Sequence, residues 1–228
     1  MQRSPDGYPA TLEIDYPDRD LNRWTTAFRI LTAIPIAIIV ALVSGPQSHG
    51  GGAPGSPSQS TVILAVGGVV FLPTVLMMLF VHRYPRWWFD WNLELTRFTT
   101  RVVAYAALLR DEYPSVEEEQ AVHMALPYPD APRELSRWLP LVKWFLAIPH
   151  YIVLVFVGLA AAVCVIVAWF AILFTGRYPR ALFDFVVGVL RWGFRVEAYA
   201  FLLATDRYPP SAFPHERRGV PTRRGMLQ

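Results

Sequence analysis

Four charged residues are regularly spaced in the segment 86–109, which is otherwise rich in apolar and aromatic residues. They stand at positions i, i+4, i+7 and i+11, and they are Asp90, Glu94, Arg97 and Arg101. At ~100° per residue these positions lie within about 60° of one another on a helix. The spacing therefore predicts a helix with one charged stripe, whose groups could pair with each other or bind an anionic headgroup.

A second segment, 180–204, repeats most of this stripe with Asp184, Arg191 and Arg195. Gly188 stands where Glu94 stands in the first stripe, so pairing with that glutamate is not what the arginines share. We expect the arginines to contact anionic lipid or a protein partner, while Asp90, Glu94 and Asp184 form a structural part of the stripe. The alternative is an internal strut held by local pairs. The expected contact residues are Arg97, Arg101, Arg191, Arg195, Arg83, Arg86, Arg177 and Arg180.

The other residues with chemical potential do not form a constellation. His150 lies inside an apolar stretch, where haem ligation would need a second ligand at matching depth, so we interpret it as a buried structural histidine. Cys164 is the single cysteine, which excludes a disulfide framework. The sequence has no nucleophile elbow, phosphate loop or zinc-type spacing. We therefore predict no catalytic residue, no cofactor, no metal site and no enzyme activity.

The longest apolar stretch runs from Trp138 to Gly176, and it has no charged residue between Lys143 and Arg177. It is about twice the length of ~18 residues that indicates a transmembrane helix. As one helix it would exceed 50 Å, against a hydrocarbon core of ~30 Å. We therefore predict two short spans that turn back near Gly158.

The composition agrees with a membrane location. The chain of 228 residues is 54% hydrophobic with a formal net charge of +3, and its mean hydropathy is +0.30. These values are too apolar for an ordinary soluble domain and give little support to nucleic-acid binding. Because the first 23 residues are polar, we expect no cleavable signal peptide. The expected location is the plasma (inner) membrane, crossed several times.

The chain carries nearly the same pattern twice. Leu21-Asn22-Arg23-Trp24 matches Leu135-Ser136-Arg137-Trp138, and Ala-Ile-Pro follows each tryptophan at the same distance. An Arg-Tyr-Pro-Arg element then precedes each striped segment, at 83–86 and 177–180. Tyr105 matches Tyr199, and Asp111 matches Asp206. We interpret the chain as an internal duplication.

We predict an all-α polytopic membrane protein in which each copy is a two-helix hairpin followed by an amphipathic interfacial helix. The expected divisions are an N-terminal arm 1–20, a first repeat 21–114 with spans 24–43 and 61–81 and striped helix 86–109, a solvated acidic linker 115–134, a second repeat 135–210 with spans 138–157 and 159–176 and striped helix 180–204, and a basic tail 211–228. Within the arm, the segment from Tyr8 to Tyr16 could form a short strand. A Gly/Ser-rich loop is expected at 44–60.

The arginine distribution favours four spans with both termini and both striped helices on the cytoplasmic side. Six spans, with the stripes facing a protein interior, are the alternative. Seven of the tyrosines precede a proline. We expect these pairs to end helices and, together with the tryptophans, to lie at the membrane interface.

Three motifs resemble domain-of-unknown-function family 4389, a family of bacterial multi-pass membrane proteins. They are the Arg-Tyr-Pro-Arg element with its following Phe-Asp, the Leu-x-Arg-Trp entry and the Asp-Arg-Tyr-Pro-Pro exit. The resemblance covers residues 8–114 and 128–210. It implies a membrane location and transfers no activity. Our leading hypothesis is a non-catalytic membrane subunit or scaffold that packs against membrane lipids, a partner protein or a second copy. The alternatives are a small transporter or channel built from the repeats and, third, an enzyme acting on lipid.

Overall fold

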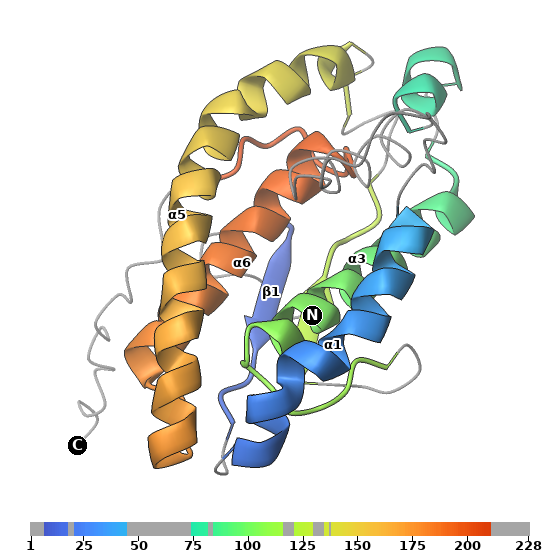
Figure 1. The fold of residues 1–228 in the computed structure, drawn as a ribbon. Helices are drawn as coiled ribbons and strands as arrows, with labels where there is room; N and C mark the ends of the chain where they lie inside the picture. Colours follow the sequence, from blue (N-terminus) through green and yellow to red (C-terminus); the bar gives the residue numbers. More distant parts are fainter. Residues whose placement is uncertain are drawn as a thin grey trace, which may run out of the picture.

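The computed structural model describes residues 7–17, 21–44, 74–81, 84–115, 121–129, 135–136 and 138–210. The predicted basic tail, nearly all of the predicted Gly/Ser loop and most of the predicted span 61–81 lie outside these residues. The elements in chain order are β1 (Thr11–Ile14), α1 (Arg23–Ser44), a π-helical turn η1 (Met77–Val81), α3 (Arg86–Ala106), β2 (Val122–Ala125), α5 (Leu139–Thr175) and α6 (Arg180–Ala200). The fold is mostly helical, with one two-stranded ribbon (Figure 1).

Helix α5 is continuous over 37 residues, so the prediction of a turn near Gly158 is wrong. One glycine inside a helix costs only about 1 kcal/mol relative to alanine. Breaking the helix in an apolar stretch would leave several backbone groups unpaired, which costs more. The helix ends instead at Gly176, whose left-handed φ of 78° closes the last turn through a bond from its N–H to the Ile172 carbonyl (2.8 Å).

Helix α6 folds back along α5 (Figure 1). Ala147, near the start of α5, packs with Val196 and Tyr199, near the end of α6. Because only residues 176–179 join the two helices, they run antiparallel and lie side by side over most of α6. Helix α1 packs in turn on α3 and contacts α5.

The two strands form an antiparallel ribbon in which Leu12 pairs with Met124 and Ile14 with Val122. These four side chains are buried, while the alternate positions of the ribbon are half-buried or exposed. The strand considered for the N-terminal arm is therefore present. The prediction that the whole linker 115–134 is solvated is wrong, because its apolar alternation forms β2 and fills the core.

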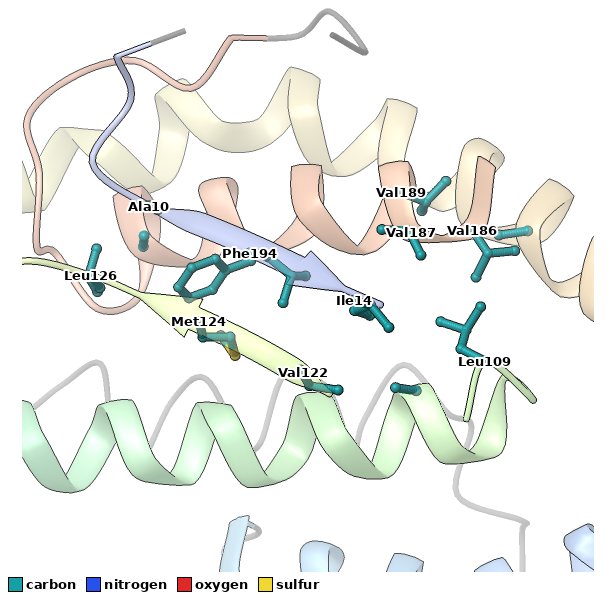
Figure 2. Close-up of a cluster of buried hydrophobic side chains, with 14 of the residues drawn as sticks. Ala10, Ile14, Leu109, Val122, Met124, Leu126, Val186, Val187, Val189 and Phe194 are labelled. Atoms are coloured by element: carbon teal, nitrogen blue, oxygen red, sulfur yellow. The ribbon is translucent and has the colours of Figure 1, made fainter. Parts of the chain in front are cut away.

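Each strand packs on the striped helix of the opposite half of the chain. Strand β1, which precedes the first half, lies against α6, and β2, which precedes the second half, lies against α3. Figure 2 shows the ribbon between these two helices, with Ile14, Val122 and Phe194 among the side chains of the shared core. This exchange ties the two halves together.

Candidate functional site

The stripe arginines hold the ribbon. Arg97 on α3 donates a hydrogen bond to the Met124 carbonyl (3.2 Å), and Arg191 on α6 donates one from Nε to the Leu12 carbonyl (2.9 Å). Their two acceptors are the residues that pair at the centre of the ribbon. A guanidinium group suits this position because it always carries its charge and its fork of donors is rigid.

The next arginine on each helix also makes internal contacts. Arg101 donates to the Ser115 carbonyl (2.6 Å) and is half-buried. Arg195 is only 3% exposed, and its guanidinium carbon lies 5.6 Å from the centre of the Tyr8 ring. The prediction that Arg195 faces anionic lipid is therefore wrong. The other three stripe arginines also make internal contacts, but these run to backbone carbonyls outside their own helices and are not the local pairs of the strut alternative.

The acidic stripe residues lie on the outer side of the helices. Asp90 and Asp184 are exposed, and the structure places no described partner on either. Glu94 forms an exposed ion pair with Arg97 three residues further on. Such a local pair contributes only a few tenths of a kcal/mol.

The flanking arginines lie beside two tyrosines from the strand segments. Arg86 lies over the Tyr128 ring at 5.0 Å and Arg180 over the Tyr16 ring at 4.6 Å. Arg177 is exposed, and Arg83 lies outside the described residues.

These two tyrosines also reach across to the starts of the striped helices. The Tyr16 hydroxyl donates to the Tyr178 carbonyl (2.5 Å), and the Tyr128 hydroxyl donates to the Tyr84 carbonyl. Tyr84 and Tyr178 are buried. The prediction that the Tyr-Pro tyrosines anchor the membrane interface is therefore wrong for Tyr84 and Tyr178.

A buried cation lies in each half, and sequence reasoning did not single out either one. In the first half, the Arg29 side chain is 2% exposed and forms an ion pair with Asp111. It also donates to the Arg110 carbonyl (3.0 Å), and its guanidinium carbon lies 4.7 Å from the centre of the Tyr105 ring. The second oxygen of Asp111 accepts the backbone N–H of Asn22 (2.9 Å). We call this group the Arg29 cluster.

The Lys143 cluster has the same plan. Lys143 Nζ lies 2.7 Å from Asp206 Oδ1, donates to the Thr205 carbonyl (2.8 Å) and lies 5.3 Å from the centre of the Tyr199 ring. The second oxygen of Asp206 accepts the backbone N–H of Ser136 (2.8 Å). Both cations follow their tryptophan by the same number of residues, and that shared spacing was the signal available in the sequence.

The two clusters have a structural role rather than a reactive one. Burial lowers the pKa of Lys143, although the carboxylate of Asp206 opposes the shift. A lysine with a lowered pKa can act as a nucleophile. However, Lys143 is fully buried beneath Tyr199, and arginine fills the matching place in the first half. The shared role is to hold the chain after the striped helix against the start of the preceding long helix.

His150 lies in an aromatic box rather than in a ligand set. Its ring centre is 4.7 Å from that of Tyr208 and 5.7 Å from that of Trp192, and the residue is 4% exposed. No group of three potential metal ligands occurs among the described residues. The histidine is buried as predicted, but the expectation that it is satisfied is wrong, because its Nε2 has no hydrogen-bond partner among the described residues.

A cavity of about 450 Å³ opens between α3 and α6, with α5 as its third wall. Most of its lining is aliphatic or aromatic. The polar residues that line it are Asn92, Thr96, Thr99, Thr100, Tyr151 and Glu197. Glu197 accepts a hydrogen bond from Thr96 Oγ1 (3.2 Å) and is the single charged residue among the described residues of the lining.

Comparison with protein families identifies the second half. The family described as "Domain of unknown function (DUF4389)" matches residues 138–212. This match covers 75 of the 228 residues. The DUF4389 segment contains α5, α6 and the Lys143 cluster, whereas the Arg29 cluster lies before it. No curated protein and no solved structure matches the chain.

Proposed function

We propose that this protein is a non-catalytic membrane subunit or scaffold, held in the plasma (inner) membrane by α5. The observation that carries this proposal is the outer face of α5. The most apolar 18 residues of the stretch Phe145–Thr175 have a mean hydropathy of 2.9, and this stretch is the one helix among the described residues that is long and apolar enough to cross a membrane. At ~1.5 Å per residue it exceeds a hydrocarbon core of ~30 Å, so it can cross with tilt.

Side chains on this face are not covered by the described residues. Phe156 is 69% exposed, Leu159 66% and Phe174 78%. Exposed apolar surface of this extent indicates contact with lipid or with another membrane protein. On α1, Trp24 and Phe28 are exposed as well.

The packing of α6 favours a protein-facing stripe over an interfacial one. Because α6 lies along α5, a bilayer that contains an upright α5 also reaches α6. On α6, Arg191 donates to the Leu12 carbonyl of the ribbon, and Arg195 is buried beside Tyr8. Charged side chains of membrane-embedded helices usually face the protein interior in this way. This arrangement supports the alternative in which the striped helices belong to the membrane-embedded bundle.

The matching contacts also support two copies of one unit. The Arg29 and Lys143 clusters recur at matched positions, as do the two arginine-to-strand bonds. A twofold relation between the copies would produce an antiparallel ribbon whose central pair joins matched residues, as Leu12 and Met124 do here.

A crosslinking experiment tests the scaffold proposal. A photoreactive amino acid replaces Phe156 in the full chain, and cells are irradiated before membranes are washed with alkaline carbonate. The chain should stay in the washed membrane and form a discrete adduct with lipid or with one protein. The matched control places the same amino acid at Glu13, on the exposed face of the ribbon, and should give no such adduct. Recovery of the wild-type chain as a soluble monomer without detergent would overturn the proposal.

A second candidate is a small transporter built from the two copies, which the cavity between α3 and α6 favours. Flux of organic cations into vesicles that contain the purified chain would support it. Vesicles without flux would leave the scaffold proposal ahead. A cysteine introduced at Ser115 and labelled from outside the cell would also show on which side of the membrane Ser115 lies.

A further inference from the structure

The cavity between α3 and α6 lies where the two halves meet. Matched positions from both halves line it: Thr99 and Gly193 form one such pair, and Val103 and Glu197 form another. Its volume of about 450 Å³ falls within the range of roughly 300–1,000 Å³ that is typical of small-molecule sites. Such sites combine apolar walls with a few converging polar groups, as this one does.

The carboxyl group of Glu197 has no basic partner in the described lining of the cavity. Glu197 accepts the Thr96 hydroxyl, but no basic side chain lines the cavity among the described residues. A carboxylate in apolar surroundings is costly unless a cation or several donors meet it. The Tyr151 hydroxyl, which is buried in the same lining, has no hydrogen-bond partner among the described residues. A cationic group in the cavity would satisfy Glu197.

We propose that this cavity binds a small organic cation with an apolar body, whose protonated amine pairs with Glu197 while its hydrocarbon part fills the space toward Tyr151 and Leu154. The walls select for hydrocarbon, and the single carboxylate selects for positive charge. An anion of the same size is excluded because it would face Glu197 without a counter-charge. This inference goes beyond the scaffold role and does not require transport.

The experiment compares three probes with the same six-carbon chain: hexylamine, hexanol and hexanoate. Equilibrium dialysis against the purified full chain in detergent gives each affinity, with empty micelles as the blank. Hexylamine should bind at least about tenfold more tightly than hexanol, and hexanoate should not bind. Glu197→Gln should reduce the preference for hexylamine at least about tenfold, because the paired charge is lost. Glu94→Gln, an exposed glutamate on α3, is the matched control and should leave all affinities unchanged.

A second variant tests the position of the site. Gly193 lines the cavity, and a Cβ built on it meets no atom within 4 Å. Leucine is compatible with the helical backbone at this position, and its side chain should fill the cavity. Hexylamine binding to Gly193→Leu should therefore fall to the level of the micelle blank. Equal affinity of the wild type for hexylamine and hexanol would overturn the proposal. Unchanged hexylamine binding in Gly193→Leu, with an unchanged melting temperature, would overturn it as well.

Discussion

Lys143 occupies in α5 the place that Arg29 occupies in α1. Each cation lies under a tyrosine ring, pairs with the aspartate that follows the striped helix and donates to a backbone carbonyl beside that aspartate. Each aspartate also accepts a backbone N–H from the segment just before the long helix. Within each half, the cluster thus holds the segment after the striped helix against the start of the long helix, while the exchanged strands join the two halves.

Removing one cation should leave a carboxylate without its partner. We expect Lys143→Met to lower the free energy of unfolding by about 3 kcal/mol, because breaking a buried pair strands the remaining charge. The double variant Lys143→Met with Asp206→Asn should recover more than half of that loss, because the asparagine oxygen still accepts the Ser136 N–H. Thermal unfolding in detergent measures both variants. A double variant no more stable than Lys143→Met would show that the aspartate acts independently of the lysine.

The lowered pKa of Lys143 makes stability depend on pH in one direction. In the unfolded chain this lysine binds a proton up to about its ordinary pKa of 10.5, whereas the folded state releases the proton at lower pH. The unfolded state therefore binds more protons between the lowered and the ordinary pKa, and stability should rise as pH increases toward 10.5. Lys143→Arg removes this contribution, because arginine stays charged in proteins. Melting temperatures of the two proteins across this range should diverge, and parallel curves would contradict the assignment.

Sequence reasoning found the two striped helices and the matched motifs, because these depend on local composition and period, but it divided α5 into two spans. The β1–β2 ribbon was only partly visible, because strands of four residues carry a weak signal. The exchange of strands between halves could not be read from the sequence, because it depends on which helix face receives Leu12 and Met124. The cavity was missed for a similar reason. The sequence analysis did not single out Glu197, and Thr96, which hydrogen-bonds to it, lies in the other half.

The arginine-to-strand bonds should stabilise the ribbon rather than bind lipid. We expect Arg191→Ala to reduce stability by about 2 kcal/mol, the scale of a hydrogen bond to a charged group. Hydrogen exchange of the β1 and β2 amides should accelerate as well. Glu13→Ala, on the exposed face of β1, is the control and should change stability by less than about 0.5 kcal/mol. Unchanged exchange together with loss of co-purified anionic lipid would restore the lipid-contact interpretation of this arginine.

Tyr16 and Tyr128, which reach between the halves, offer a matched pair of substitutions with smaller expected effects on stability. Tyr16→Phe removes the bond to the Tyr178 carbonyl, and Tyr128→Phe removes the bond to the Tyr84 carbonyl. Each should lower stability by about 1 kcal/mol, and the aromatic packing of Tyr16 on Phe183 should persist. Thermal unfolding of each variant measures the loss. A loss in only one variant would show that the two halves do not share this contact energetically.

The continuity of α5 can be tested at two glycines with opposite conformations. Gly158 is helical, and a Cβ built on it meets nothing within 4 Å, so Gly158→Ala should be neutral or stabilising by up to about 1 kcal/mol. Gly176 has a φ of 78°, where an L side chain is strained, so Gly176→Ala should destabilise by about 1–2 kcal/mol. If the chain instead turned back near Gly158, that glycine would carry the strained conformation and Gly158→Ala would be the damaging change. Melting temperatures of the two variants in detergent therefore distinguish one long helix from two short spans.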